Sequence, residues 1–199
     1  LCNYNNERDA VPFFAQATTI DPNFAQGYAW LALALAVTFV LEAHAESLSA
    51  AMQAAQRAMT LDANDSTVHW GNALALMYSR DHERAGVHFD RAIALNPAVV
   101  QIGADRANWL RFNGRLEEAL AAIDNALKVG PLAPQWFWAW RGEILFDLER
   151  YRDAIDAFNN VPQKSHIAYC YMAAARAYLG DEANASQALG KAKEIRPSV

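Results

Sequence analysis

The side chains best suited to catalysis or metal binding in this 199-residue sequence are five histidines, two cysteines and a few neighbouring acids. A metal site needs histidines, cysteines or acids grouped at fixed spacings, and no histidine here has such a neighbour. His82 and His88 lie six residues apart, so they do not share one face of a helix. The sequence therefore predicts surface or interface histidines, with no metal and no cofactor.

Nucleophilic and acid–base chemistry also lacks the spacing that it needs. A reactive thiol requires a nearby base or a helix N-terminus, and neither accompanies Cys170, which we expect to be buried and unreactive. Glu117 and Glu118 are adjacent on an expected outer helix face, whereas catalytic acid pairs need a cleft. The glycines stand singly, so no phosphate-cradling loop is predicted. We expect a protein with no catalytic residues and no enzymatic activity.

Tryptophan is concentrated in "QWFWAWRGE", residues 135–143, where three tryptophans fall within five positions. Such a cluster could stack on bases, anchor a chain in a membrane or fill a core. On a helix, Trp136 and Trp140 share a face while Trp138 points nearly the opposite way. Trp138 therefore lies on a different face of the helix from Trp136 and Trp140.

Charge and hydropathy exclude two classes of partner. The net charge is −5 and the 17 basic residues are scattered, so no basic stripe marks a nucleic-acid interface. The uncharged run at 22–41 contains too short an apolar stretch for a bilayer span. Cys2 and Cys170 suggest no disulfide scaffold, so we expect a reducing, cytoplasmic location. Because the sequence opens at Leu1, we expect a piece of a longer protein.

An internal repeat organises the chain. Hydrophobic residues make up 53% of it, glycine and proline are few, and alanine recurs periodically, which favours packed helices. Four segments align, each with an alanine three residues after its start and usually a proline near its end: 14–25, 55–66, 89–100 and 123–134. Ala63, Pro97 and Pro131 hold the equivalent position at steps of 34 residues. Such a period fits two helices per unit, each unit stacking on the next.

This pattern resembles the tetratricopeptide repeat (TPR). The unit starting at Ser66 matches the family's small and large positions at Ala73, Leu76, Ala85, Phe89, Ala92 and Pro97. Units starting at Val100, Gln135 and His166 follow, although the second of these three lacks the last alanine and proline, and Arg176 departs from the pattern in the third. Small residues let the two helices of a hairpin approach, and proline ends the second helix.

The resemblance implies an all-α fold: a right-handed α-solenoid of about five TPR helix hairpins in a single domain, 1–199. The predicted repeats are 1–24 (partial), 25–65, 66–99, 100–134, 135–165 and 166–199. The predicted helices are 8–20, 25–41, 46–61, 66–79, 82–95, 100–113, 116–129, 134–148, 151–160, 165–179 and 182–195. Asp9 is expected to cap the first of them, with Pro12 in its first turn. About seven extra residues near 38–47 should give a longer first helix or a looser turn.

In the family that this chain resembles, the first helices line a concave groove. The resemblance implies that Trp138, at the fourth position of its repeat, fills the core and that Trp136, at the second, faces the groove. The matching positions form an apolar trough with a polar middle: Trp70, Leu74, Met77, Asn108, Arg111, Trp136 and Glu143. Such a groove suits a protein or peptide ligand, because large exposed apolar patches usually mark an interface. No lysine occupies the positions with which some members clamp a C-terminal carboxylate. The open alternative is a groove covered by the chain's own curvature or by a second copy.

Function is expected to be that of a non-enzymatic interaction scaffold. The stretches 13–35, 51–66 and 171–197 also resemble TPR regions at the C-terminal end of bacterial adenylate/guanylate cyclases and of some winged-helix regulators. This second resemblance implies a regulatory module of a larger bacterial signalling protein. The alternative is a self-association module, a homo-oligomer of such an enzyme, because Phe13 and Phe14 could seek a partner.

Overall fold

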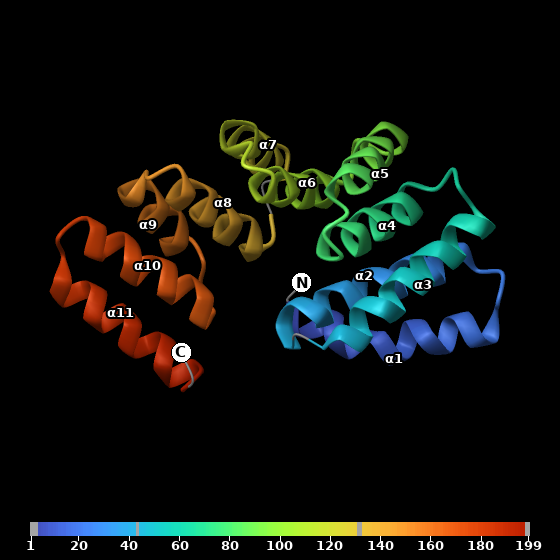
Figure 1. The fold of residues 1–199 in the computed structure, drawn as a ribbon, viewed down its shortest axis with the longest axis horizontal. Helices are drawn as coiled ribbons and strands as arrows, with labels where there is room; N and C mark the ends of the chain where they lie inside the picture. The colour runs from blue at the N-terminus through green and yellow to red at the C-terminus, as the bar shows by residue number, and fades with distance from the viewer. Residues whose placement is uncertain (1–3, 43, 131–132, 198–199) are drawn as a thin grey trace. The chain divides into compact units, whose positions relative to one another are not determined.

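The computed structural model describes residues 4–42, 44–130 and 133–197, and within these ranges it contains eleven helices and no strand. Their bounds are α1 Tyr4–Ile20, α2 Ala25–Glu42, α3 Ala45–Leu61, α4 Ser66–Tyr78, α5 His82–Leu95, α6 Val100–Phe112, α7 Leu116–Val129, α8 Gln135–Asp147, α9 Tyr151–Asn159, α10 His166–Tyr178 and α11 Glu182–Ile195. The all-α expectation is confirmed, and α5, α7 and α11 have the predicted bounds (Figure 1).

The start of the chain differs from the prediction. Helix α1 begins at Tyr4, not residue 8, so Asp9 lies inside the helix and cannot be its N-cap. Pro12 lies in the middle of α1 and not in its first turn, where it removes one backbone hydrogen bond. The extra residues of the second repeat lengthen the helix, since α2 runs for 18 residues. Pro131 and Cys2, which the sequence singled out, lie outside the described residues.

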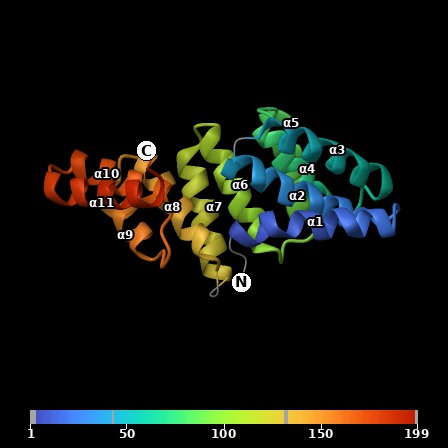
Figure 2. The ribbon, with the colours of Figure 1, turned by 90° about the horizontal axis from the view of Figure 1, so that it is seen from below.

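The chain forms two compact units, Leu1–Trp109 and Leu110–Val199, with the boundary inside α6. In unit 1, α2 packs against α1, α3 and α4, and α4 packs against α5 (Figures 1 and 2). In unit 2, α8 packs against α7, α9 and α10, and α10 packs against α11. A single 199-residue domain with the repeat bounds given above stays a prediction.

Alanines allow the helices of a hairpin to pack closely, as the repeat pattern predicted. Ala85 and Ala92 of α5 are fully buried, as is Ala119 of α7, and Ala126 is nearly so. Larger residues then fill the core beside them, among them Phe89 in unit 1 and Phe158 in unit 2. Burial of these apolar surfaces is the main term that holds each unit together.

The turns inside four hairpins share one backbone feature. Arg80, Gly114, Glu149 and Gly180 each lie two residues beyond the end of a first helix and have positive φ angles of 67°, 71°, 60° and 76°. A left-handed residue there ends the first helix and reverses the chain. Side chains also cap four helix N-termini by accepting backbone N–H bonds. The capping residues are Asp65 for α4, Asp81 for α5, Ser165 for α10 and Asp181 for α11.

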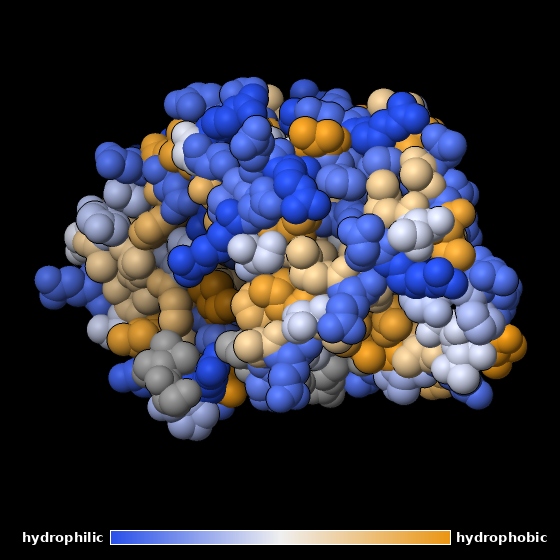
Figure 3. All heavy atoms as spheres, turned by 45° about the vertical axis from the view of Figure 1, so that its right-hand side comes forward, coloured by the Kyte–Doolittle hydropathy of each residue, from blue (hydrophilic) through white to orange (hydrophobic). Residues whose placement is uncertain are grey.

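The surface is mixed. Figure 3 shows hydrophobic residues in several separate patches among hydrophilic ones on one face. Among the helices of the described part, none combines the length and apolar character needed to cross a membrane.

Candidate functional site

Aromatic contacts join α1, α2 and α4 in unit 1. Trp30 of α2 stacks on Phe14 of α1 at 6.0 Å and meets Trp70 of α4 edge-on at 5.7 Å, measured between ring centroids. The Trp70 indole N–H then donates to the buried Asp105 carboxylate of α6 over 2.5 Å. Trp30 is 40% exposed, so this row, which we call the unit 1 aromatic row, opens to solvent at Trp30.

The other predicted groove residues of unit 1 lie deeper. Leu74 and Met77 are buried in α4, where ten consecutive residues are buried, because α4 is covered by α2, α3 and α5. Asn108 of α6 is also buried, and its side-chain oxygen has no hydrogen-bond partner. A buried polar atom without a partner costs free energy, which distinguishes Asn108 from the apolar core around it.

In unit 2, Arg111 is the centre of a polar network, which we call the Arg111 network. Its Nε donates to Asp147, its Nη1 to Glu143 and its Nη2 to the Tyr171 hydroxyl, each over 2.6 Å. The three partners come from α8 and α10, so one guanidinium ties together the first helices of three successive repeats. Charge-assisted bonds of this kind are among the stronger polar contacts in proteins.

The Arg111 network holds two carboxylates against one guanidinium. The pKa of Glu143 is raised from 4.5 to about 7, chiefly by burial, with Arg111 lowering it and Asp147 raising it by smaller amounts. Burial also raises the pKa of the Tyr171 hydroxyl, with the Glu143 charge acting in the same direction. Burial acts to lower the pKa of Arg111, but its acidic neighbours outweigh this and raise it. The Arg111 charge is therefore stabilised by its acidic neighbours, and Asp147 is the more exposed of the two carboxylates.

Aromatic rings continue from this network toward the turn between α10 and α11. Phe146 meets Tyr171 at 5.1 Å and Tyr178 at 6.1 Å between centroids. Tyr178 stacks face to face on Tyr151 at 4.6 Å, yet 68% of it remains exposed. The exposed Tyr178 ring therefore contacts Phe146, the residue that precedes Asp147 in α8.

The tryptophans of α8 divide as their spacing predicted. Trp136 and Trp140 lie together with ring centroids 4.5 Å apart. Trp138 is half-buried and packs against the core cluster around Phe158. Trp136 is buried and not open to solvent, because it also packs edge-on against Phe137.

The structure thus describes all seven residues that were expected in the groove, and none of them is fully exposed to solvent. Trp70, Leu74, Met77 and Asn108 belong to unit 1, and Arg111, Trp136 and Glu143 belong to unit 2. The structure joins Arg111 to Glu143, whereas sequence reasoning missed their partners Asp147 and Tyr171 and the buried Asp105. Asp105 lies three residues before Asn108 and Asp147 four residues after Glu143, so each shares a helix face with a predicted groove residue, and this was the signal available. Whether the seven residues bind a partner stays a prediction.

One histidine expectation is wrong. His69 is buried, and its Nδ1 lies 3.0 Å from the Nδ1 of His88 across the α4–α5 hairpin. The sequence could not pair them, because they lie 19 residues apart on different helices. In the described part of the chain no three histidines, cysteines or acids gather as a metal site would require. Glu117 and Glu118 are exposed, and Cys170 is half-buried, not buried as expected.

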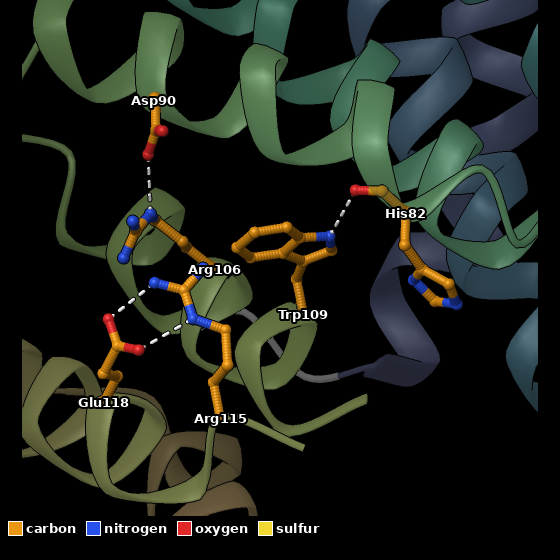
Figure 4. A network of polar contacts seen from close by, with 6 residues as sticks. All are labelled: His82, Asp90, Arg106, Trp109, Arg115 and Glu118. Atoms are coloured by element: carbon orange, nitrogen blue, oxygen red, sulfur yellow. Dashed lines mark hydrogen bonds and ion pairs between the residues drawn. The ribbon is translucent and has the colours of Figure 1, made fainter. Parts of the chain in front are cut away.

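Other polar contacts near α6 lie outside the candidate site. In unit 1, the Trp109 indole donates to the His82 carbonyl over 2.9 Å, and Arg106 donates to the exposed Asp90 over 2.8 Å (Figure 4). In unit 2, Arg115 makes two bonds to Glu118 within α7 and its cap (Figure 4). Surface pairs such as these contribute little to stability.

Comparison with known proteins identifies the fold. No family model and no curated protein matches the sequence. Among solved structures, the chain is similar to human IFIT1, seen as a dimer with PPP-AAAA, with a TM-score of 0.81 and 17% identity over 96% of this chain and 46% of IFIT1. TTC0263, a TPR protein of Thermus thermophilus, gives a TM-score of 0.70 and 18% identity, covering 87% of this chain and 92% of TTC0263.

YrrB, a TPR protein with an unusual peptide-binding site, gives a TM-score of 0.59 and 18% identity over 92% of both chains. The all-α architecture and these neighbours show an α-solenoid of the TPR type. The chain spans less than half of IFIT1 but most of the two smaller TPR proteins. At such low identity the comparison concerns the fold alone.

Proposed function

We propose that this chain is a non-enzymatic protein-interaction scaffold that binds a peptide or a partner helix along the groove formed by its first helices. The observation that carries the proposal is the arrangement of aromatic and charged side chains on those helices. The unit 1 aromatic row and the Arg111 network both connect successive first helices, and each contains a solvent-exposed group, Trp30 in the row and Asp147 in the network. Apolar rings beside a few fixed polar groups are the usual composition of a peptide site.

A protein of similar fold supports the peptide-binding part of the proposal. YrrB is a TPR protein with an unusual peptide-binding site. A peptide fits this chain better than a nucleic acid, because the chain carries a net charge of −5 and would repel phosphates. Following the sequence resemblance, we propose that the scaffold is a cytoplasmic regulatory module of a larger bacterial protein, such as a nucleotide cyclase.

Affinity capture tests the proposal with substitutions of the solvent-exposed residues. The buried tryptophans are left intact, because Trp70→Ala or Trp136→Ala would remove a buried ring and unfold the site. The immobilised chain is compared with Trp30→Ser and Asp147→Asn, and with Val87→Ser as the control. Val87 is exposed on the second helix α5. A partner recovered by wild type and Val87→Ser, but lost with Trp30→Ser or Asp147→Asn, supports the groove. Equal recovery by all four proteins rejects it.

Self-association is the second candidate, and one observation favours it. Helix α1 exposes Phe13 by 70% and Ile20 by 76%. Exposed large apolar side chains on one helix are typical of surfaces that pack against another chain. Light scattering over a wide concentration range decides between the candidates. A dimer that Phe13→Ser converts to a monomer supports self-association, and a monomer at every concentration rejects it.

A further inference from the structure

We propose that unit 2 recognises a basic side chain, arginine or lysine, of a peptide partner, through the Asp147 carboxylate and the exposed ring of Tyr178. This inference rests on the proposed peptide-binding function and adds the chemistry of the partner. It is carried by two independent features, the charge of the Arg111 network and the aromatic surface beside it.

The first feature is that the cation in the network is already occupied. Arg111 is 10% exposed at its side chain, and all three of its guanidinium nitrogens donate to Asp147, Glu143 and Tyr171. An anionic ligand, such as a peptide C-terminus, would have to displace one of these acceptors. The edge of the network that solvent reaches is an acid instead, because Asp147 is 31% exposed.

Acidic side chains outnumber basic ones in this network. Two carboxylates share one guanidinium, and the exposed Glu149 follows two residues after Asp147. A ligand cation at this edge would meet the exposed Asp147 carboxylate with complementary charge.

The second feature is the aromatic surface. Tyr178 is supported on one face by Tyr151, and Phe146 contacts it edge-on, so the ring is held in place while most of it stays open. Cations bind favourably over such faces, and arginine does so most often. The unit already contains this contact type, because the Arg111 guanidinium carbon lies 5.7 Å from the Tyr171 ring centroid. A ligand cation over Tyr178 with its head toward Asp147 would repeat that arrangement.

Selection from a random peptide library displayed on phage tests the inference with the full chain. Wild-type protein is expected to select peptides enriched in arginine or lysine at one position. A synthetic peptide of the selected sequence is then compared with its citrulline analogue, which keeps the shape of arginine without its charge. We expect the analogue to bind about tenfold more weakly, and we expect high salt to reduce the difference.

Variants locate the contact. Asp147→Asn and Tyr178→Ala are each expected to weaken the arginine peptide several-fold and to leave the citrulline peptide almost unchanged. Asp153→Asn is the matched control, because Asp153 is an exposed acid of the same unit that pairs with Arg150. Circular dichroism confirms that each variant is folded before binding is measured.

The outcomes separate this inference from the function on which it rests. If no peptide is selected at all, the proposed peptide-binding function fails and the inference fails with it. If peptides are selected but contain no enriched basic position, or if Asp147→Asn binds them as tightly as wild type does, the scaffold stands and the inference is overturned. Equal binding of the arginine and citrulline peptides also overturns it.

Discussion

The Nδ1 atoms of His69 and His88 lie 3.0 Å apart and join α4 to α5 within one hairpin. The Nε2 of His69 lies 3.0 Å from the Ala63 carbonyl, so this nitrogen carries a hydrogen and donates it. In the neutral ring, Nδ1 of His69 is therefore the acceptor, and His88 donates its Nδ1 hydrogen to it. One added proton leaves this bond intact, whereas two protonated rings would repel each other.

This histidine pair predicts that stability falls in mild acid. Burial lowers the pKa of His88 from 6.5, and the nearby charges of His69 and Arg84 lower it further. The unfolded chain therefore binds a proton more readily than the folded chain as the pH falls through 6.5. Urea unfolding should show this contribution in full above that pH and its loss below. His88→Gln should flatten the dependence, and an unchanged slope in this variant would exclude the pair as its source.

Glu143 predicts an opposite trend. Its pKa is raised from 4.5 to about 7 in the folded protein, chiefly by burial. Between these values the unfolded chain loses the proton while the folded chain keeps it, so folding becomes less favourable as the pH rises. Glu143→Gln mimics the protonated acid and removes this loss. The variant should gain about 2–3 kcal/mol relative to wild type between pH 4.5 and pH 8. A constant difference at all pH values would contradict the assignment.

The elements of the fold could be predicted because their signals are local. Alanine spacing, the 34-residue step and the prolines lie within single repeats, so most helix ends were found to within a residue or two. The prediction was wrong where a local signal competed with tertiary packing. Asp9 is a good N-cap residue and Pro12 a good first-turn residue, yet α1, which packs against α2, begins before both.

The site was only partly predictable, because it depends on contacts between repeats. Arg111 and Glu143 were expected on one face, and their hydrogen bond connects residues 32 apart. Nothing in the sequence shows how far each side chain is covered by the neighbouring hairpin, so the burial of Trp136 could not be inferred. The His69–His88 contact depends on the rotation of two helices about their axes, which a repeat pattern does not define.

Trp70→Phe should destabilise the protein by about 1–3 kcal/mol, because the buried Asp105 carboxylate loses the indole donor that lies 2.5 Å away. The ring contact with Trp30 would largely remain, so the loss reports the hydrogen bond. Trp30→Phe is the control, since it shortens an aromatic side chain on the same row without touching that bond. Chemical denaturation of both variants tests the expectation, and similar losses would show that ring size matters more than the bond to Asp105.

Gly86→Ala should be destabilising although alanine favours helices. A Cβ at Gly86 would lie 2.5 Å from the Trp109 ring, and that indole is held by its bond to the His82 carbonyl. The clash should outweigh the helix-propensity gain of about 1 kcal/mol and leave a net loss of about 1–2 kcal/mol. Gly103→Ala in α6 is the matched control, because its Cβ would meet no atom within 4 Å. Thermal unfolding should rank Gly103→Ala above wild type and Gly86→Ala below it.

The turns that close the hairpins make the last prediction. Glycine occupies the left-handed position at Gly114, where φ is 71°, but arginine holds it at Arg80, where φ is 67°. A side chain in this conformation costs about 1 kcal/mol relative to glycine. Arg80→Gly should therefore stabilise unit 1 by up to about 1 kcal/mol, and Gly114→Ala should cost about 1–2 kcal/mol although a Cβ there meets no atom within 4 Å. Denaturation midpoints of the two variants should move in opposite directions, and a shift in the same direction would show that the backbone angle does not control these turns.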